Sequence, residues 1–334
     1  MSSDLRPSKL ELAHLPTPIE RRPALDALIG TEVWVKRDDA NGGAEAGNKL
    51  RKLEYLFAAA LAERADVVIT CGGIQSNHAR ATAIVARRLG LQPVLALRTE
   101  DIPGPREGNL LLDDLVDAEL HFITRAQYAE RDALMAELAA DYARKGRRAY
   151  VIPEGGSNGL GALGYFDAMR EVRAQLDQNI TLPRRFDAVV HACGSGGTAA
   201  GVVLGAAHFD VADEVIAMAV CDDSAYFEAR IAGIVDDARS HLVLGSPGTP
   251  GMPQHARLRV LDAYKGPAYG VPSPDQIALI RAAARTAGLL FDPVYTGKAL
   301  YGLSQLSPKP ARVLFLHTGG LPGLLAEHAR FARG

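Results

Sequence analysis

Residues 47–55 read Gly-Asn-Lys-Leu-Arg-Lys-Leu-Glu-Tyr, and Lys49 is the residue around which the rest of the chain is interpreted. The glycine favours a turn, and the apolar residues that follow recur at the spacing of one helical face, which predicts a helix over 50–61. A lysine held on packed backbone between the turn and the helix can form an imine with a carbonyl cofactor. From this stretch alone, a surface helix with solvated lysines remains an alternative.

The composition is that of an ordinary folded protein: 334 residues, 48% hydrophobic, 23% charged, with a formal net charge of -2. With so small a net charge, the protein has no overall electrostatic field that would attract nucleic acid or an anionic membrane. The three cysteines, Cys71, Cys193 and Cys221, share no metal-ligand spacing and are expected to be free thiols in a reducing compartment. No apolar run has the length of a signal peptide or a membrane span, so we expect a cytoplasmic protein without a metal.

Strand and helix patterns alternate along most of the chain. Short buried strands are predicted at 66–70, 93–97, 119–124, 148–153, 186–192, 215–220 and 311–316. Among the helices we expect one long helix at 126–145, one at 163–176 and a terminal helix from Leu324, and we expect a surface loop at 245–253. This alternation indicates an α/β fold with mostly parallel sheets covered by helices on both faces.

The strand predicted at 186–192 runs into Gly194-Ser195-Gly196-Gly197-Thr198 and then into a helix of small residues. Glycines let backbone N–H groups turn inward, and the helix N-terminus adds its positive end, so this loop can hold one phosphate. The loop lacks the G-x-G-x-x-G spacing of a dinucleotide site, and a tight turn without a ligand remains the alternative. A P-loop at Lys49 is excluded, because Leu50 stands where a magnesium-binding Ser or Thr is required.

Three further turns carry polar side chains. In Gly-Ile-Gln-Ser-Asn-His at 73–78, Ser76 or Asn77 is predicted to cap a helix, whose free N–H groups can hold a substrate carboxylate. Tyr269 and Tyr295 lie in turns fixed by proline and glycine, where a tyrosine can donate a proton or stack on a planar ring. Each also has a purely structural explanation, as a helix cap or as an aromatic side chain at the edge of the core.

Four stretches together resemble the D-cysteine desulfhydrase / 1-aminocyclopropane-1-carboxylate deaminase family. They are residues 47–55, residues 73–78, Asp-Pro-Val-Tyr-Thr-Gly-Lys at 292–298 and His-Thr-Gly-Gly at 317–320. The resemblance extends over nearly the whole chain and implies a pyridoxal 5′-phosphate enzyme of the tryptophan-synthase-β-like fold (PLP fold type II). It further implies a larger cofactor-binding domain formed by 1–49 and 161–334, a smaller inserted α/β domain at 50–160, a cofactor between them, and a homodimer.

The resemblance also implies roles for individual residues. Lys49 would be the Schiff-base lysine, and Asn77 would bond the phenolic oxygen of the cofactor. Ser76 would take the substrate carboxylate, and Tyr295 and Tyr269 would flank the reacting centre, which makes these three the catalytic residues together with Lys49. The cofactor phosphate would be held by Lys52 and by Gly194, Ser195, Gly196, Gly197 and Thr198.

Two positions separate activities within the family. The deaminases carry a carboxylate where this chain has Thr296 and a leucine where it has Thr318, whereas the desulfhydrases resemble this chain at both positions. A carboxylate beside the pyridine nitrogen keeps that nitrogen protonated, which opening a cyclopropane requires, while a hydroxyl leaves a weaker electron sink that suffices for β-elimination. The resemblance therefore implies a β-eliminating lyase that contacts its cofactor through both threonines and acts on a small sulfur amino acid, D-cysteine first.

The sequence departs from the family pattern at three places. Ala46 replaces a glycine that usually precedes Gly-Asn-Lys, Glu154 introduces an acid before a glycine pair, and residues 245–253 have a composition of their own. The latter two leave the identity of the amino acid open, since L-cysteate sulfo-lyases, which expel sulfite, look similar across the same motifs. Outside the enzymes, the alternative is an α/β protein that binds a phosphorylated metabolite through residues 194–198 and makes no use of Lys49.

Overall fold

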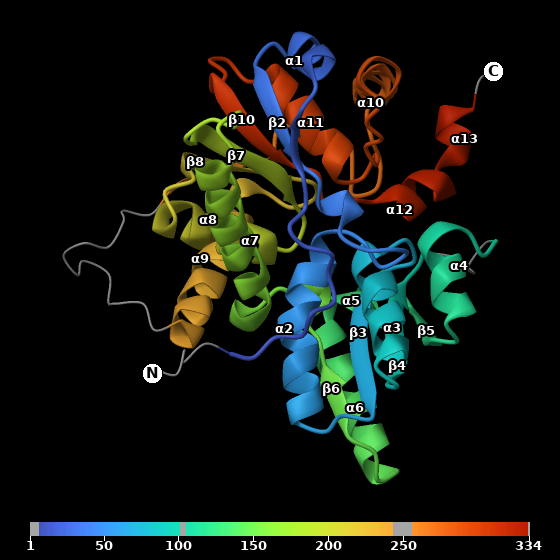
Figure 1. Cartoon of the computed structure of the whole chain (residues 1–334). Coiled ribbons are helices and arrows are strands. Elements are labelled where there is room, and N and C mark those ends of the chain that lie inside the picture. The colour runs from blue at the N-terminus through green and yellow to red at the C-terminus, as the bar shows by residue number, and fades with distance from the viewer. Residues whose placement is uncertain (1–6, 101–104, 243–255, 333–334) are drawn as a thin grey trace, which may run out of the picture.

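The computed structural model describes residues 7–100, 105–242 and 256–332 and places their strands in two sheets (Figure 1). The spatial order of the six-stranded sheet is β1 (Ile19–Arg21), β2 (Glu32–Lys36), β10 (Arg312–Leu316), β7 (Phe186–Cys193), β8 (Ala212–Ala219) and β9 (Arg257–Leu261). The order of the four-stranded sheet is β5 (Glu119–Ile123), β4 (Gln92–Arg98), β3 (Val67–Gly73) and β6 (Ala149–Val151). The strand pairs in these sheets are parallel, except that β1 runs antiparallel to β2.

Helices cover both faces of each sheet, as the alternation predicts. On the six-stranded sheet, α1 (Pro23–Ile29), α10 (Pro274–Ala287) and α11 (Thr296–Gln305) cover one face, and α7 (Gly159–Gln178), α8 (Gly197–His208) and α9 (Ser224–His241) cover the other (Figure 1). On the four-stranded sheet, α2 (Asn48–Ala62), α3 (Asn77–Arg88) and α4 (Gly108–Leu115) lie opposite α5 (Arg125–Ala129) and α6 (Arg131–Arg144). Two short helices, α12 (Leu321–Ala326) and α13 (His328–Phe331), follow β10. The predicted fold class, two mostly parallel three-layer α/β units, is confirmed.

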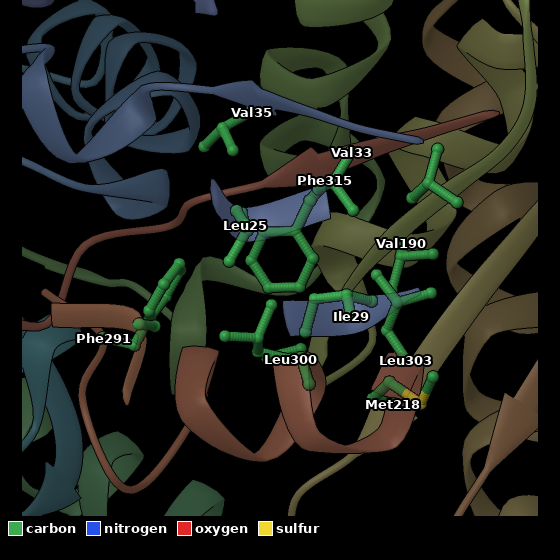
Figure 2. Packing of buried hydrophobic residues seen from close by; sticks show 14 of the residues in the cluster. Leu25, Ile29, Val33, Val35, Val190, Met218, Phe291, Leu300, Leu303 and Phe315 are labelled. Atoms are coloured by element: carbon green, nitrogen blue, oxygen red, sulfur yellow. The ribbon is translucent and has the colours of Figure 1, made fainter. Parts of the chain in front are cut away.

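The central strands are apolar on both faces because helices bury both. In β10, Phe315 packs toward Leu25 of α1 and Leu300 of α11 (Figure 2), while Leu314 and Leu316 enter the core beneath α7 and α8. A continuous apolar run of this kind is typical of a strand buried inside a parallel sheet. None of the helices in the described ranges combines the length and the hydropathy that a membrane span needs.

The proposed domain division stays a prediction. The strands of the four-stranded sheet all fall between Val67 and Val151, and those of the six-stranded sheet lie on either side of them in the chain. Helix α2, however, packs on both units: Leu53 joins the core under the small sheet, and Tyr55 joins the core around α8. This helix therefore connects the two units directly.

Two predicted helices differ from the structure. The helix expected at 126–145 is broken at Glu130 (φ -99°, ψ 24°) into α5, which begins with a capping box at Thr124, and α6. Helix α7 begins at Gly159, four residues before the predicted start, because the Asn158 side chain caps it by accepting a hydrogen bond from the Gly161 N–H at 2.9 Å. The glycine run continues into this helix because a Cβ on Gly164 would lie 2.4 Å from the Arg51 carbonyl oxygen, so the run indicates close helix packing and not a loop.

Several elements have no counterpart in the sequence prediction. Helices α1, α9 and α11 and strand β9 are absent from it, and α12 begins at Leu321 instead of Leu324. The buried residues of α9 recur at helical spacing, so this pattern could have identified the helix: Phe227, Ile231, Ile234, Val235 and Ala238. The loop predicted at 245–253 lies outside the described residues.

A buried ionic cluster attaches the start of α2 to the six-stranded unit. The Arg51 guanidinium pairs with Asp38 after β2 (2.7 Å) and with Glu171 on α7 (3.0 Å). The Tyr165 hydroxyl donates a hydrogen bond to the same Asp38 carboxylate at 2.6 Å, and Lys36 pairs with Glu171. Burial alone would raise the pKa of Asp38, but Arg51 and Lys36 hold it below its usual value. The cluster therefore stays charged and fixes the helix that carries Lys49.

We expect Arg51→Met to lower the free energy of unfolding by about 3–5 kcal/mol, because the change leaves buried carboxylates without their partner. The measurement is urea unfolding followed by circular dichroism. Arg170→Met is the matched control on α7, since Arg170 forms an exposed ion pair with Asp167 at 3.1 Å that contributes about 1 kcal/mol or less. Equal losses in the two variants would contradict the structural role given to Arg51.

Candidate active site

A cavity of about 470 Å³ lies between the carboxyl-terminal edges of the two sheets. One wall comes from the ends of β3, β4 and β6, and the other from the ends of β7, β8 and β10. Parallel sheets bind ligands at this edge, because strand ends and helix N-termini converge there. Most of the predicted site residues line it: Lys49, Ser76, Asn77, Gly194, Ser195, Gly196, Thr198, Tyr269, Tyr295 and Thr318.

Lys49 lies in the first turn of α2 and turns its side chain into this cavity. Enclosure by protein lowers the pKa of Lys49 to about 8, and the nearby Glu154 carboxylate opposes that shift. A lysine with this pKa is partly neutral near pH 7, which a nucleophilic or basic amine requires. Lys49 thus has the position in the cavity and the partly neutral amine that imine formation requires.

The predicted phosphate loop joins β7 to α8. Gly196 has a φ of 86°, which a residue with a side chain rarely adopts, and this turn opens the N-terminus of α8 toward the cavity. The loop is held from outside by Ser157, whose hydroxyl lies 2.8 Å from that of Ser195 and accepts a hydrogen bond from the Gly197 N–H at 3.2 Å. On the other side, Arg230 of α9 donates to the Ser195 carbonyl at 3.0 Å. The loop is therefore a rigid, positively polarised cradle.

Lys52 lies directly behind the cradle. A Cβ on Gly197 would lie 3.0 Å from the Lys52 Nζ, which donates to the Gly155 carbonyl at 3.1 Å and to the Ser157 hydroxyl at 3.4 Å. In the described part of the chain, no carboxylate pairs with this lysine. Burial, together with repulsion from Lys49 and Arg230, lowers the pKa of Lys52 well below its usual value. A phosphate dianion in the cradle would supply the missing counter-charge, so these residues fit the phosphate of the expected cofactor.

Two buried polar atoms of α3 also fit a ligand in the cavity. The Asn77 Oδ1 and the His78 Nδ1 have no hydrogen-bond partner among the described residues. The Thr70 hydroxyl donates to the Ile152 carbonyl at 2.8 Å, so its oxygen accepts from the His78 Nε2 at 2.8 Å. Burial and the neighbouring Lys49 hold the pKa of His78 well below its usual value, which leaves the neutral ring with an acceptor at Nδ1.

The two predicted tyrosines meet across the cavity wall. The Tyr269 and Tyr295 hydroxyl oxygens lie 2.6 Å apart, and the rings meet edge to face at a centroid distance of 6.1 Å. Burial raises the pKa of Tyr269 to about 12, and burial together with Tyr269 raises the pKa of Tyr295 well above its usual value. Both hydroxyls are therefore protonated and can donate to a departing group.

Thr296 departs from its predicted position. It is fully buried and does not line the cavity, whereas Thr318 does. The Thr296 hydroxyl donates to the Asp292 carboxylate at 2.6 Å and accepts from the Asp292 N–H at 2.9 Å. This pairing arises because Asp292 also caps α11, accepting the N–H of Thr296 at 2.8 Å. The Thr296 hydroxyl is thus bonded to Asp292, and its contact with the cofactor stays a prediction.

Sequence reasoning missed several residues of the cavity wall. Arg98 ends β4, Tyr128 lies on α5, Arg131 begins α6, and Arg230 lies on α9. The position of Arg98 at the carboxyl end of a predicted strand could have identified it. Arg230 carried no such signal, because α9 was absent from the prediction. The three cysteines are free, as predicted, and all three line this cavity, where burial raises the pKa of each thiol to about 12.

Comparison with known proteins identifies the family of this chain. A family model described as pyridoxal-phosphate dependent enzyme matches residues 10–319, and the chain belongs to that family. The crystal structure of an ACC deaminase homologue superposes with a TM-score of 0.87 at 33% identity, covering 99% of this chain and 98% of the other. The fold and the cofactor implied by the sequence, pyridoxal 5′-phosphate, are thereby confirmed.

Two curated relatives are similar to this chain over nearly its full length. A bifunctional D-cysteine desulfhydrase/1-aminocyclopropane-1-carboxylate deaminase of Arabidopsis thaliana is 40% identical, over 97% of this chain and 81% of the relative. A D-cysteine desulfhydrase of Yersinia pestis is 39% identical over 96% of each chain. The resemblance drawn from four short motifs is confirmed at the level of the family.

We expect cofactor-free protein to capture pyridoxal 5′-phosphate at a rate that rises with pH and levels off above about pH 8, because only the neutral Lys49 amine attacks the aldehyde. The rate is followed by the absorbance of the lysine adduct. Glu154→Gln is the matched variant. Without the carboxylate, nothing at this position raises the pKa of Lys49, so the pH at the inflection of the rate profile should be lower than in the wild type. An inflection at the ordinary lysine value of about 10.4 would contradict the enclosed environment.

We expect Lys52→Met to weaken binding of pyridoxal 5′-phosphate by about tenfold or more, since hydrogen bonds to charged groups are worth about 1.5–3 kcal/mol. Pyridoxal, which lacks the phosphate, is the control ligand and should bind both proteins equally. The dissociation constants are measured by fluorescence titration of cofactor-free protein. An equal loss for the two ligands would show that Lys52 does not serve the phosphate.

Proposed function

We propose that this chain is a pyridoxal 5′-phosphate-dependent lyase that eliminates the β-substituent of a small sulfur-containing amino acid, with D-cysteine as the first candidate. The observation that carries the proposal is the enclosure of Lys49, with its lowered pKa, in one cavity with the phosphate cradle and the paired hydroxyls of Tyr269 and Tyr295. Its similarity to a D-cysteine desulfhydrase supports the choice of substrate.

When bound, the cofactor supplies an electron sink for charge that develops at the substrate Cα. The N-terminus of α3 and the Ser76 hydroxyl, which already accepts the Ala79 N–H at 3.1 Å, lie where they can hold the α-carboxylate. The neutral Lys49 amine takes the Cα proton. Tyr295, kept protonated and oriented by Tyr269, donates to the sulfur as the Cβ–S bond breaks and its electron pair leaves with the sulfur. The remaining unsaturated product hydrolyses to pyruvate and ammonia.

Deamination of the cyclopropane amino acid is disfavoured in this proposal. The name of the Arabidopsis thaliana relative includes this deaminase activity, so it is the activity against which β-elimination is compared. Threonines occupy the two positions where the deaminases carry a carboxylate and a leucine, and the Thr296 hydroxyl is committed to Asp292. A substrate panel of D-cysteine, L-cysteine, β-chloro-D-alanine, L-cysteate and the cyclopropane amino acid ranks these activities directly by pyruvate or ketoacid release.

We also propose that the protein is a cytoplasmic homodimer. Exposed leucines support self-association: Leu111, Leu290, Leu321 and Leu325 are 40%, 55%, 51% and 61% exposed and line one hollow formed by α4 and α12. An apolar surface of this kind on a folded chain is typical of a protein interface. Light scattering on the purified protein tests the assembly, and a monomer at micromolar concentration would contradict it.

We expect Lys49→Ala to lower kcat for D-cysteine by at least the factor of about 100 to 10,000 that a general base contributes, while cofactor still binds noncovalently. Borohydride reduction followed by peptide mapping should place the pyridoxyl group on Lys49 in the wild type. Lys145→Ala, at the exposed lysine that follows α6, is the control and should keep full turnover. A pyridoxyl group on another residue, or elimination activity retained in Lys49→Ala, would overturn the role assigned to Lys49. A colourless protein that does not react with borohydride would instead favour the alternative of a protein that binds a phosphorylated metabolite.

A further inference from the structure

Lys298 is a fully buried lysine close to the cavity that has no part in the proposed reaction. It lies in the first turn of α11, three residues after Tyr295. Its Nζ donates hydrogen bonds to three backbone carbonyls: that of Ala268 at 2.9 Å, that of Val220 at 3.5 Å, and that of Lys265. A lysine ammonium has three donors and no acceptor, so these carbonyls use its whole hydrogen-bonding capacity.

The ammonium of Lys298 is held by carbonyl dipoles instead of a carboxylate. Burial lowers the pKa of Lys298 to about 8, so the side chain is still charged at pH 7 and keeps its three donors. Within the ranges that the structure describes, no carboxylate forms an ion pair with it. A buried charge needs fixed polar partners, because leaving it without them is costly. The ammonium therefore fixes the positions of the three carbonyls as firmly as they fix the ammonium.

Two of the three carbonyls belong to the connection between β9 and α10, which carries Tyr269. This connection consists of turns and bends with one isolated bridge, between Ala268 and Val271, so no strand ladder holds it in place. The Ala268 carbonyl belongs to the peptide group that joins Ala268 to Tyr269. A hydrogen bond from Lys298 to this carbonyl therefore fixes the backbone from which the Tyr269 side chain leaves.

Helix α11 consequently controls both members of the tyrosine pair. It begins at Tyr295, whose backbone N–H is accepted by the Asp292 carboxylate at 2.8 Å, and it reaches the backbone at Tyr269 through Lys298. The two hydroxyl oxygens, 2.6 Å apart, share one hydrogen bond. When the Tyr269 hydroxyl donates this bond, the proton of Tyr295 is left free for the substrate.

We infer that Lys298 is a positioning residue for protonation of the leaving group: it fixes the backbone at Tyr269 so that the Tyr269 hydroxyl orients that of Tyr295. The inference rests on the proposed function, in which Tyr295 gives its proton to the sulfur as the Cβ–S bond breaks and the electron pair leaves with the sulfur. Lys298 itself does not line the cavity, so it acts only through the two tyrosines. A lysine that merely stabilised the fold would affect every substrate alike.

The test compares two leaving groups that differ in their need for a proton. Sulfide is a base, and its departure is assisted by protonation, whereas chloride leaves without a proton. Pyruvate release by the holoenzyme gives kcat for D-cysteine and for β-chloro-D-alanine. We expect Lys298→Met to lower kcat for D-cysteine by about tenfold or more, a part of the factor of about 100 to 10,000 that a general acid contributes, and to change kcat for β-chloro-D-alanine by less than about twofold.

Lys36→Met is the matched control. Lys36 is also fully buried and also donates to a backbone carbonyl, that of Thr17 at 2.7 Å, but it belongs to the ionic cluster at the end of β2. This cluster supports the helix of Lys49, whose task of taking the Cα proton is common to both substrates. The ratio of the two kcat values should therefore equal that of the wild type.

Two further variants connect Lys298 to the proton donor. In Tyr295→Phe the ratio should already be low, and adding Lys298→Met should not lower it further, because both changes remove the same step. Lys298→Gln keeps two N–H donors and should give an intermediate ratio. It also provides the comparison where Lys298→Met does not fold.

A second measurement requires no turnover. With 3-fluorotyrosine in the holoenzyme, each tyrosine gives a fluorine NMR resonance, and single Tyr→Phe variants assign those of residues 269 and 142. We expect Lys298→Met to shift or broaden the resonance of residue 269, because its backbone loses two hydrogen bonds. The resonance of Tyr142, on α6, should stay unchanged, and Lys36→Met should change neither.

Two outcomes overturn the inference: an equal change in kcat for the two substrates in Lys298→Met, or a resonance of residue 269 that does not respond to this substitution. Failure of the proposed function gives a different result, namely no pyruvate from either substrate in the wild type. In that case the NMR experiment still decides whether Lys298 positions Tyr269.

Discussion

The pairing of Arg51 with Asp38 and Glu171 is the constraint on which the geometry of the cavity depends. Arg51 and Lys49 are two residues apart on α2, so their side chains leave the helix in different directions, one into the protein and the other into the cavity. A buried guanidinium must keep its carboxylates, because separating them leaves charge in a medium that solvates it poorly. Helix α2 therefore cannot slide or rotate without a large cost, and the amine of Lys49 is held between two sheets that come from distant parts of the chain.

The cavity itself shows the opposite electrostatic arrangement. Arg98 and Arg230 line it and Lys52 lies directly behind the phosphate cradle, and few carboxylates balance these three side chains. By contrast Arg51, the residue next to Lys52 in the chain, is paired with two carboxylates. Unpaired buried charge lowers the free energy of unfolding of the ligand-free protein. An anion that binds to the folded state raises this free energy again, because it binds the folded and not the unfolded chain. The phosphate cradle and the wall around Arg98 are two such regions of the same cavity. Charged side chains of the scaffold are thus paired with opposite charges, whereas positive side chains near the ligand-binding cavity are left unpaired.

Much of the fold and part of the site could be predicted from local patterns. The β7–loop–α8 unit, the cap at Ser76 and helix α2, which carries Lys49, each consist of residues that are close together in the chain. Their periodicity and turn chemistry are therefore visible in the sequence itself. The same local reasoning placed the start of α7 four residues too late, because the glycines there are required by contact with α2 inside the helix. It also did not anticipate that the Thr296 hydroxyl is bonded to the Asp292 carboxylate.

The sequence by itself determined the class of fold, the family and its cofactor. It also predicted Lys49 as the imine-forming residue and residues 194–198 as the phosphate loop, since each of these depends on residues that are neighbours in the chain. The tertiary structure alone decided that Tyr269 meets Tyr295, that Glu154 pairs with Arg131, and that Arg98 rests on two tyrosines contributed by different units. The physical reason is that periodicity and turn propensity report local backbone geometry. Contacts between distant segments depend on how whole helices and sheets pack, which no short stretch of residues records.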